Sequence, residues 1–258
     1  MKKTLFLLLL ISTLFACIDN TSELVSDSTD GVGGSYARFI IVNNFMYVID
    51  ETYIITFDVS QAAHPVEIDK QRIGERIESI FTFQGNLFIG SGFGMFIYEI
   101  LDSGIPKLLS ETPHFAFNDF ACDPVVANAS YAYLTLNTQR RIERNCTSET
   151  IEANLLKIYN VTDLNQPELL AEYDMFAPKG IGLDGTTLFV CDDKEGLKIF
   201  DVTDPLNIKS IVHFKNFTAF DVIPLNGLLL VVGPENVYEF DYTDLNNIQL
   251  LSSFAHGS

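Results

Sequence analysis

The sequence predicts an all-β protein, a five-bladed β-propeller built from four-stranded antiparallel blades. The first observation is a short phrase that occurs five times and reads ITFDVS, FIYEIL, KIYNVT, KIFDVT and YEFDYT in chain order. Its central aromatic residue is Phe57, Tyr98, Tyr159, Phe200 or Phe240, and the steps between them are 41, 61, 41 and 40 residues. A fixed period of about 40 residues is typical of a repeated unit that buries its core only against neighbouring copies.

The second observation is the pattern inside each period. Apolar residues alternate with polar ones or form short β-branched and aromatic runs, which indicates strands rather than helices. In the first copy these runs are 39–42, 46–49, 54–59 and 66–69, with a turn around Asn44. Four strands with short turns use about 40 residues, which is the size of one propeller blade. The later first turns are expected near Gly85, Asn128, Gly185 and Gly227, and the later fourth strands at 107–110, 168–171, 209–212 and 249–252.

The first segment, residues 1–16, has the layout of a secretory signal. Lys2 and Lys3 precede an apolar run over 5–11, which is too short to remain as a membrane span. The small residue before Cys17 resembles the lipobox of bacterial lipoproteins, which implies a lipid on Cys17 and a membrane partner reached through it. Ordinary secretion is the alternative. Because Ile18 rather than aspartate follows, the resemblance implies the outer membrane and leaves its side open.

The next segment, residues 17–35, is rich in Ser, Thr, Asp and Gly, which predicts a flexible tether. Residues 36–258 are long enough for one propeller domain. Its repeats are expected at about 36–75, 76–115, 116–176, 177–216 and 217–254. The formal net charge of the whole chain is −18. Such a field repels nucleic acid, which we exclude as a partner.

The repeat phrase also resembles a known family. FDVTDPLNIKSI, residues 200–211, is similar to the LVIVD repeat of bacterial and archaeal surface β-propellers. The resemblance implies the propeller fold and little about activity, because that family has no shared catalytic set. An acid follows the aromatic residue at Asp58, Asp201 and Asp241. We interpret these acids as acceptors that close the turn before the fourth strand, rather than as a metal site.

The one long step places an insertion at about 137–154 in the third copy. In a propeller, this loop and the start of the inner strand lie on the same face, here called the top face. Cys122 lies at that start and Cys146 lies in the insertion, so an oxidising compartment predicts a disulfide between them. Closing a loop of about 25 residues would contribute roughly 3.5 kcal/mol in the chain-entropy model. Cys191 is interpreted as a small buried apolar side chain.

Candidate ligand-binding residues are expected on the top face. Counting back from the first turn of each copy predicts a mixed ring at the central channel, made of Arg38, Ser79, Asp123, Lys179 and Asp221. Pairing among these residues at the rim is the alternative interpretation. The insertion adds the basic cluster Arg140, Arg141 and Arg144, which is otherwise a solvated loop. Phe115 and Phe117 are candidates for stacking on sugar rings, whereas Tyr173, Phe176, Phe217 and Phe220 are expected mainly to pack between blades.

Catalytic motifs are absent from the sequence, and we expect no cofactor. Asp192, Asp193 and Glu195 could hold Ca²⁺ on one short loop, although three solvated acids are the favoured interpretation. The sequence therefore predicts a non-catalytic binding module of the cell envelope, with a protein or glycan ligand near the top of the channel. The alternative is an enzyme that acts on a glycan with Asp123 and Asp221 as paired carboxylates.

Overall fold

The first two blades follow the predicted order of strands. The computed structural model describes residues 34–113, 124–137 and 154–255. Blade 1 contains β1 (Phe39–Val42), β2 (Phe45–Ile49), β3 (Tyr53–Asp58) and β4 (Val66–Arg72). Blade 2 contains β5 (Ile77–Phe83), β6 (Asn86–Ser91), β7 (Gly94–Ile100) and β8 (Pro106–Pro113).

The last three blades repeat this arrangement. Blade 3 contains β9 (Val125–Ala127), β10 (Tyr131–Asn137), β11 (Asn154–Asn160) and β12 (Glu168–Asp174). Blade 4 contains β13 (Ile181–Asp184), β14 (Thr187–Cys191), β15 (Leu197–Asp201) and β16 (Lys209–Phe214). Blade 5 contains β17 (Asp221–Leu225), β18 (Leu228–Val232), β19 (Asn236–Asp241) and β20 (Gln249–Ala255). Five four-stranded antiparallel sheets confirm the predicted five-bladed β-propeller.

The recurring acid closes the turn before the fourth strand in blades 1, 4 and 5, as predicted. The carboxylates of Asp58, Asp201 and Asp241 each accept a hydrogen bond from the backbone N–H two residues later, at 2.8 to 2.9 Å. Asn160 accepts the same bond from Thr162 at 3.0 Å. Hydrogen bonds from Thr203 lower the pKa of Asp201, because they favour the ionised carboxylate. In blade 2 the equivalent residue, Glu99, instead pairs with Lys107 at 3.3 Å. The other four side chains therefore serve the fold of their blades rather than a ligand.

The hydrophobic core lies between neighbouring blades. Four clusters of buried side chains join blades 1 and 2, 2 and 3, 3 and 4, and 4 and 5. Cys191 belongs to the last of these, where it is a free thiol whose pKa is raised by burial. This confirms its interpretation as a buried apolar side chain. The described residues contain no helix long and apolar enough to span a membrane.

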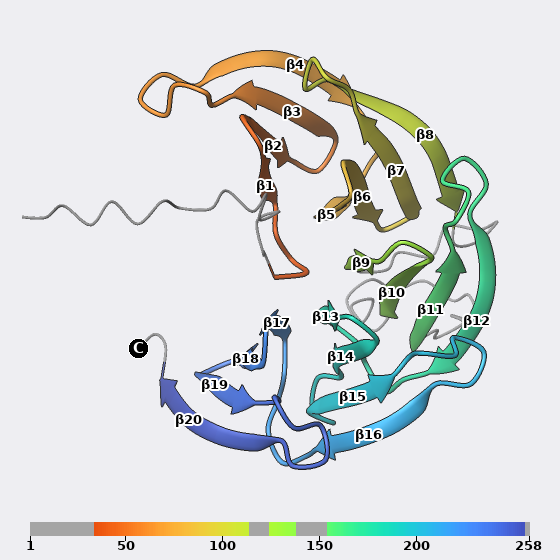
Figure 1. The fold of residues 1–258 in the computed structure, drawn as a ribbon, viewed down its shortest axis with the longest axis vertical. Coiled ribbons are helices and arrows are strands. Elements are labelled where there is room, and N and C mark those ends of the chain that lie inside the picture. Colours follow the sequence, from red (N-terminus) through yellow and green to blue (C-terminus); the bar gives the residue numbers. More distant parts are fainter. Residues whose placement is uncertain (1–33, 114–123, 138–153, 256–258) are drawn as a thin grey trace, which may run out of the picture.

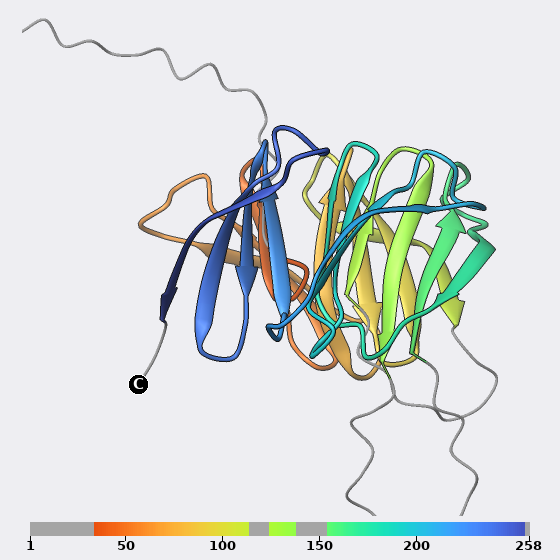
Figure 2. The same ribbon diagram turned by 90° about the horizontal axis from the view of Figure 1, so that it is seen from below.

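The blades stand side by side around a central axis, with their strands running between two faces (Figures 1 and 2). The inner strands pack in series, β1 against β5, β5 against β9, β9 against β13 and β13 against β17. In the described part of the chain, no comparable contact joins β17 to β1. Blades 1 and 5 therefore form the two ends of an arc (Figure 1).

Candidate functional site

The N-terminal edge of the domain crosses the central channel. Ser35 was expected in the flexible tether, but it is buried. Its Oγ donates a hydrogen bond to Asp221 at 2.7 Å and accepts one from the backbone N–H of Ile181 at 2.8 Å. The carbonyl of Ala37 also accepts a bond from Ile80 of blade 2 at 3.1 Å. Ser35 therefore belongs to the folded domain, because the polar groups of this segment find partners on three blades.

Asp221 lies beneath this N-terminal segment. Its carboxylate accepts hydrogen bonds from Ser35 Oγ and from the backbone N–H of Val222, the second at 2.9 Å. Burial raises the pKa of Asp221, and the hydrogen bonds oppose that shift only in part. The side chain predicted to face a ligand in the channel is thus covered by the protein's own chain.

The other described members of the predicted ring differ in their surroundings. Lys179 Nζ pairs with Asp193 at 3.0 Å and lies 4.0 Å from the centre of the Phe220 ring. Ser79 is fully buried within β5, and Arg38 is exposed just before β1. The ring therefore does not present one continuous surface. Of the two interpretations, ion pairing at the rim describes Lys179, although its partner is Asp193 rather than a ring member.

The three acids considered for Ca²⁺ are held by separate partners. Asp192 is fully buried, where it forms an ion pair with Lys198 and accepts hydrogen bonds from the backbone N–H groups of Phe176 and Ala177. The expectation that Asp192 is exposed to solvent is therefore wrong. Asp193 pairs with Lys179, while Glu195 lies 3.9 Å from Lys215. Among the described residues, no three His, Cys, Asp or Glu side chains gather closely enough to hold a metal ion.

The ion pairs Asp192–Lys198 and Asp193–Lys179 are here called the polar network. The base of the predicted insertion lies beside it. Asn137 and Asn154, which end β10 and begin β11, donate hydrogen bonds to the carbonyls of Pro178 and Phe176 at 3.0 and 2.7 Å. The remaining candidates lie outside the described residues. They are Cys17, Phe115, Phe117, Cys122, Asp123, Arg140, Arg141, Arg144 and Cys146.

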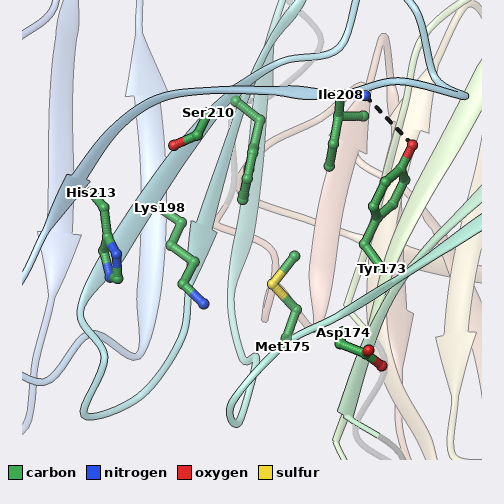
Figure 3. Close-up of a pocket in the computed structure, with 8 residues that line it drawn as sticks. Tyr173, Asp174, Met175, Lys198, Ile208, Ser210 and His213 are labelled. Atoms are coloured by element: carbon green, nitrogen blue, oxygen red, sulfur yellow. Dashed lines mark hydrogen bonds between the residues drawn. The ribbon is translucent and has the colours of Figure 1, made fainter.

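A cavity of about 380 Å³ lies between blades 3 and 4, close to the polar network (Figure 3). Its walls are formed by Tyr173, Asp174, Met175, Lys198, Phe200, Ile208, Ser210 and His213. Tyr173 is held in place because its hydroxyl donates to the carbonyl of Pro205 at 2.9 Å. The Lys198 ammonium faces this cavity while pairing with buried Asp192, so the cavity and the network share one charged group.

The sequence analysis did not identify this cavity, although one signal was present. Ser210 faces Phe200 across the outer ladder of blade 4. The residues in the same register of the other four blades are larger, namely Glu67, Leu108, Leu169 and Leu250. A small side chain at one repeat of a position that is otherwise large indicates space in front of it.

The raised pKa of Asp221 gives a prediction about stability and pH. A carboxyl group whose pKa is higher in the folded than in the unfolded protein binds protons more tightly when folded, so its contribution to stability falls as pH rises. We expect the free energy of unfolding of the wild type, relative to Asp221→Asn, to decrease from about pH 4 up to the raised pKa. Urea unfolding of both proteins at several pH values measures this difference. A difference that does not change with pH, or increases, would contradict the prediction.

Comparison with known proteins shows the class of fold. No protein-family model matches the chain, and neither does any curated protein. A functionally unknown protein from Desulfotomaculum acetoxidans has a TM-score of 0.67 at 15% identity, over 90% of this chain and 75% of that one. A protein from Lactobacillus plantarum has a TM-score of 0.63 at 15% identity, over 81% and 67%. The Pseudomonas aeruginosa periplasmic gluconolactonase PpgL has a TM-score of 0.60 at 13% identity, over 83% and 68%.

These solved structures are β-propeller-like, so this chain is a β-propeller protein. Identities of 13 to 15% show the fold alone. The activity named for the gluconolactonase is therefore a property of that protein alone.

Proposed function

We propose that this propeller is a non-catalytic binding module of the LVIVD-repeat type. In this proposal a lipid on Cys17 holds the module at the bacterial outer membrane, and the ligand is an envelope glycan or a protein that carries one. The ligand binds at the top face, where the cavity between blades 3 and 4 opens beside the polar network. The N-terminal signal and the lipid belong to the proposal because they are inferred from the sequence.

The observation that carries the proposal is the lining of the cavity. A volume of about 380 Å³ is within the range of small-ligand sites, which are mostly apolar with a few placed polar groups. Tyr173 and Phe200 offer aromatic surface, whereas Lys198 and Ser210 offer donors. Sugar rings have apolar faces and rims of hydroxyl groups, so this combination suits a sugar unit. Asp174, Lys198 and His213 lie at the top-face ends of β12, β15 and β16, which gives a longer glycan a path across the top face.

The competing proposal is an enzyme that uses Asp123 and Asp221 on a glycan. The raised pKa of Asp221 suits a general acid, which is the one observation in its favour. However, Asp221 Oδ1 accepts a hydrogen bond from the hydroxyl of Ser35, and Asp221 Oδ2 lies against the backbone of Gly34. A substrate would have to displace this segment before reaching the carboxylate. Binding without catalysis is therefore the function that the geometry supports better.

A cavity-filling variant tests the proposed binding site. We expect Ser210→Trp to reduce capture of envelope glycans by at least about tenfold, because the indole would occupy the space in front of Phe200. The probe is an array of bacterial envelope glycans, incubated with labelled chain 18–258. Leu108→Trp is the matched control, since Leu108 has the same register in β8 and is likewise exposed.

The outcomes separate the two proposals. Loss of glycan capture in Ser210→Trp alone supports binding in the cavity. Equal capture by both tryptophan variants and the wild type would contradict it. Release of new reducing ends from the glycan, abolished by Asp221→Asn, would instead establish the enzyme. An Arg140/Arg141/Arg144→Ala variant measures how much the insertion contributes to the same capture.

A further inference from the structure

In the part of the chain that the structure describes, the arc of five blades leaves two apolar sheet faces without a neighbouring blade. We call the face of a blade that points to the next blade in the chain its forward face, and the opposite face its backward face. Each of the four interfaces between blades joins the forward face of one blade to the backward face of the next. Among the described residues, none packs as a further blade against the backward face of blade 1 or the forward face of blade 5. Because the repeats share one register, each free residue can be compared with equivalent residues that are packed in the other blades.

The free face of blade 1 carries the side chains of a packed interface. Phe39 and Ile41 of β1 pair with Val48 and Met46 of β2, so all four share this face. Phe39 is 59% exposed. The equivalent residues of the other blades are only 0 to 2% exposed, and they are Ile80, Val125, Ile181 and Val222. A phenylalanine this exposed has lost the burial that its position provides elsewhere.

The free face of blade 5 is also apolar toward the channel. Leu225, Leu230, Val232 and Val237 lie on this face, and Leu225 is 37% exposed. Val237 is partly exposed. The residues equivalent to Val237 in the other four blades are fully buried, and they are Ile54, Met95, Leu156 and Leu197. The first described residue of the N-terminal segment lies over the innermost part of this face, where Gly34 lies against Asp221 and Ile223.

The outer part of the free face of blade 1 carries two cations and one acid, Glu67, whereas the free face of blade 5 carries an acid. Lys70 and Arg72 of β4 pair with Ile55 and Tyr53, which puts both cations on the free face of blade 1. The Lys70 ammonium lies 4.6 Å from the centre of the Tyr53 ring, consistent with this placement. On blade 5, Glu239 occupies the free face. Its equivalents are fully buried and uncharged, namely Thr56, Ile97, Ile158 and Ile199.

We propose that the free forward face of blade 5 packs against the free backward face of blade 1 in a second copy of this chain. The contact continues the inter-blade interface that occurs four times within each copy, with apolar strands inside and Glu239 near Lys70 and Arg72 outside. It is heterologous, joining two different surfaces, so it closes as a ring of copies or extends as a chain. This assembly is independent of the proposed glycan site, because the cavity lies between blades 3 and 4.

The experiment measures association of the chain 18–258, which contains every described residue, by light scattering and analytical ultracentrifugation. The wild type is expected to associate with rising concentration. Phe39→Asp blocks one face and Leu225→Asp the other, so each alone is expected to weaken association at least tenfold. Both side chains are exposed, so folding should survive, which circular dichroism checks. Leu206→Asp, on an exposed turn outside both faces, is the control.

Mixing the two blocked variants gives the decisive result. Each still has one intact face of opposite kind, so an equimolar mixture is expected to form a one-to-one dimer and nothing larger. A wild type that stays monomeric at all concentrations would overturn the proposal. So would a mixture that fails to dimerise, because a contact between like faces would be blocked by only one variant. Glu239→Lys should weaken association, and Lys70→Glu in the partner should restore it in part.

Discussion

Replacement of Asp192 by alanine is expected to lower the free energy of unfolding by about 3 kcal/mol. Asp192 is fully buried, and its carboxylate pairs with Lys198 while accepting the backbone N–H groups of Phe176 and Ala177. Removing one partner of a buried ion pair costs several kcal/mol, and each buried donor left without an acceptor adds about 1–3 kcal/mol. Lys198 is partly exposed and can regain water, which keeps the expected loss near the lower end.

Chemical denaturation of the wild type and of matched variants measures this loss. Asp192→Asn retains an acceptor for the two backbone groups and is expected to lose less. Lys198→Met combined with Asp192→Asn removes both charges, and we expect it to recover part of the stability. If alanine at 192 costs no more than about 0.5 kcal/mol, the network does not hold the loops of blades 3 and 4 together. The same side chain orients Lys198 toward the cavity, so glycan capture should fall along with stability.

The blades were predictable because their signals are local and repeated. The central aromatic residue of the repeated phrase, the acid after it and the turn before the fourth strand lie within a few residues of one another. Each recurs at nearly the same spacing. Asp58, Asp201 and Asp241 have the same turn contact because the same short segment makes it. A signal repeated five times also separates fold from function, since a residue needed by every blade is not specific to one site.

The environment of the candidate site residues was less predictable, because it depends on contacts between residues that are distant in the sequence. Ser35 and Asp221 are 186 residues apart, and nothing in either local pattern indicates their hydrogen bond. Asp192 resembles an exposed loop acid, yet the backbone after β12 covers it. The small residue Ser210, visible when the repeats are compared, is a signal in the sequence that could have indicated the cavity, but the sequence analysis did not use it. The period of the repeat thus predicts which residues share a position, and only the assembled blades show which positions lack a neighbour.

Replacement of Gly196 by alanine is expected to destabilise the protein by about 2–4 kcal/mol. Gly196 has a φ of +83°, a conformation that costs a residue with a Cβ roughly 1 kcal/mol. In addition, its Cβ would overlap the backbone carbonyl oxygen of Phe214, which cannot rotate away as a side chain can. Either the β14–β15 turn or the end of β16 must move, and that adds strain of about 1–3 kcal/mol.

Gly185 provides the matched control for Gly196. It also has a positive φ, +57°, but no atom lies within 4 Å of the place where its Cβ would be. Gly185→Ala should therefore cost only the conformational part, about 1 kcal/mol. Because Gly196 ends the turn that carries Asp192, Asp193 and Glu195, its substitution should also disturb the pairs with Lys179 and Lys198. Urea unfolding compares the two variants, and equal losses would show that the carbonyl of Phe214 imposes no steric limit on this turn.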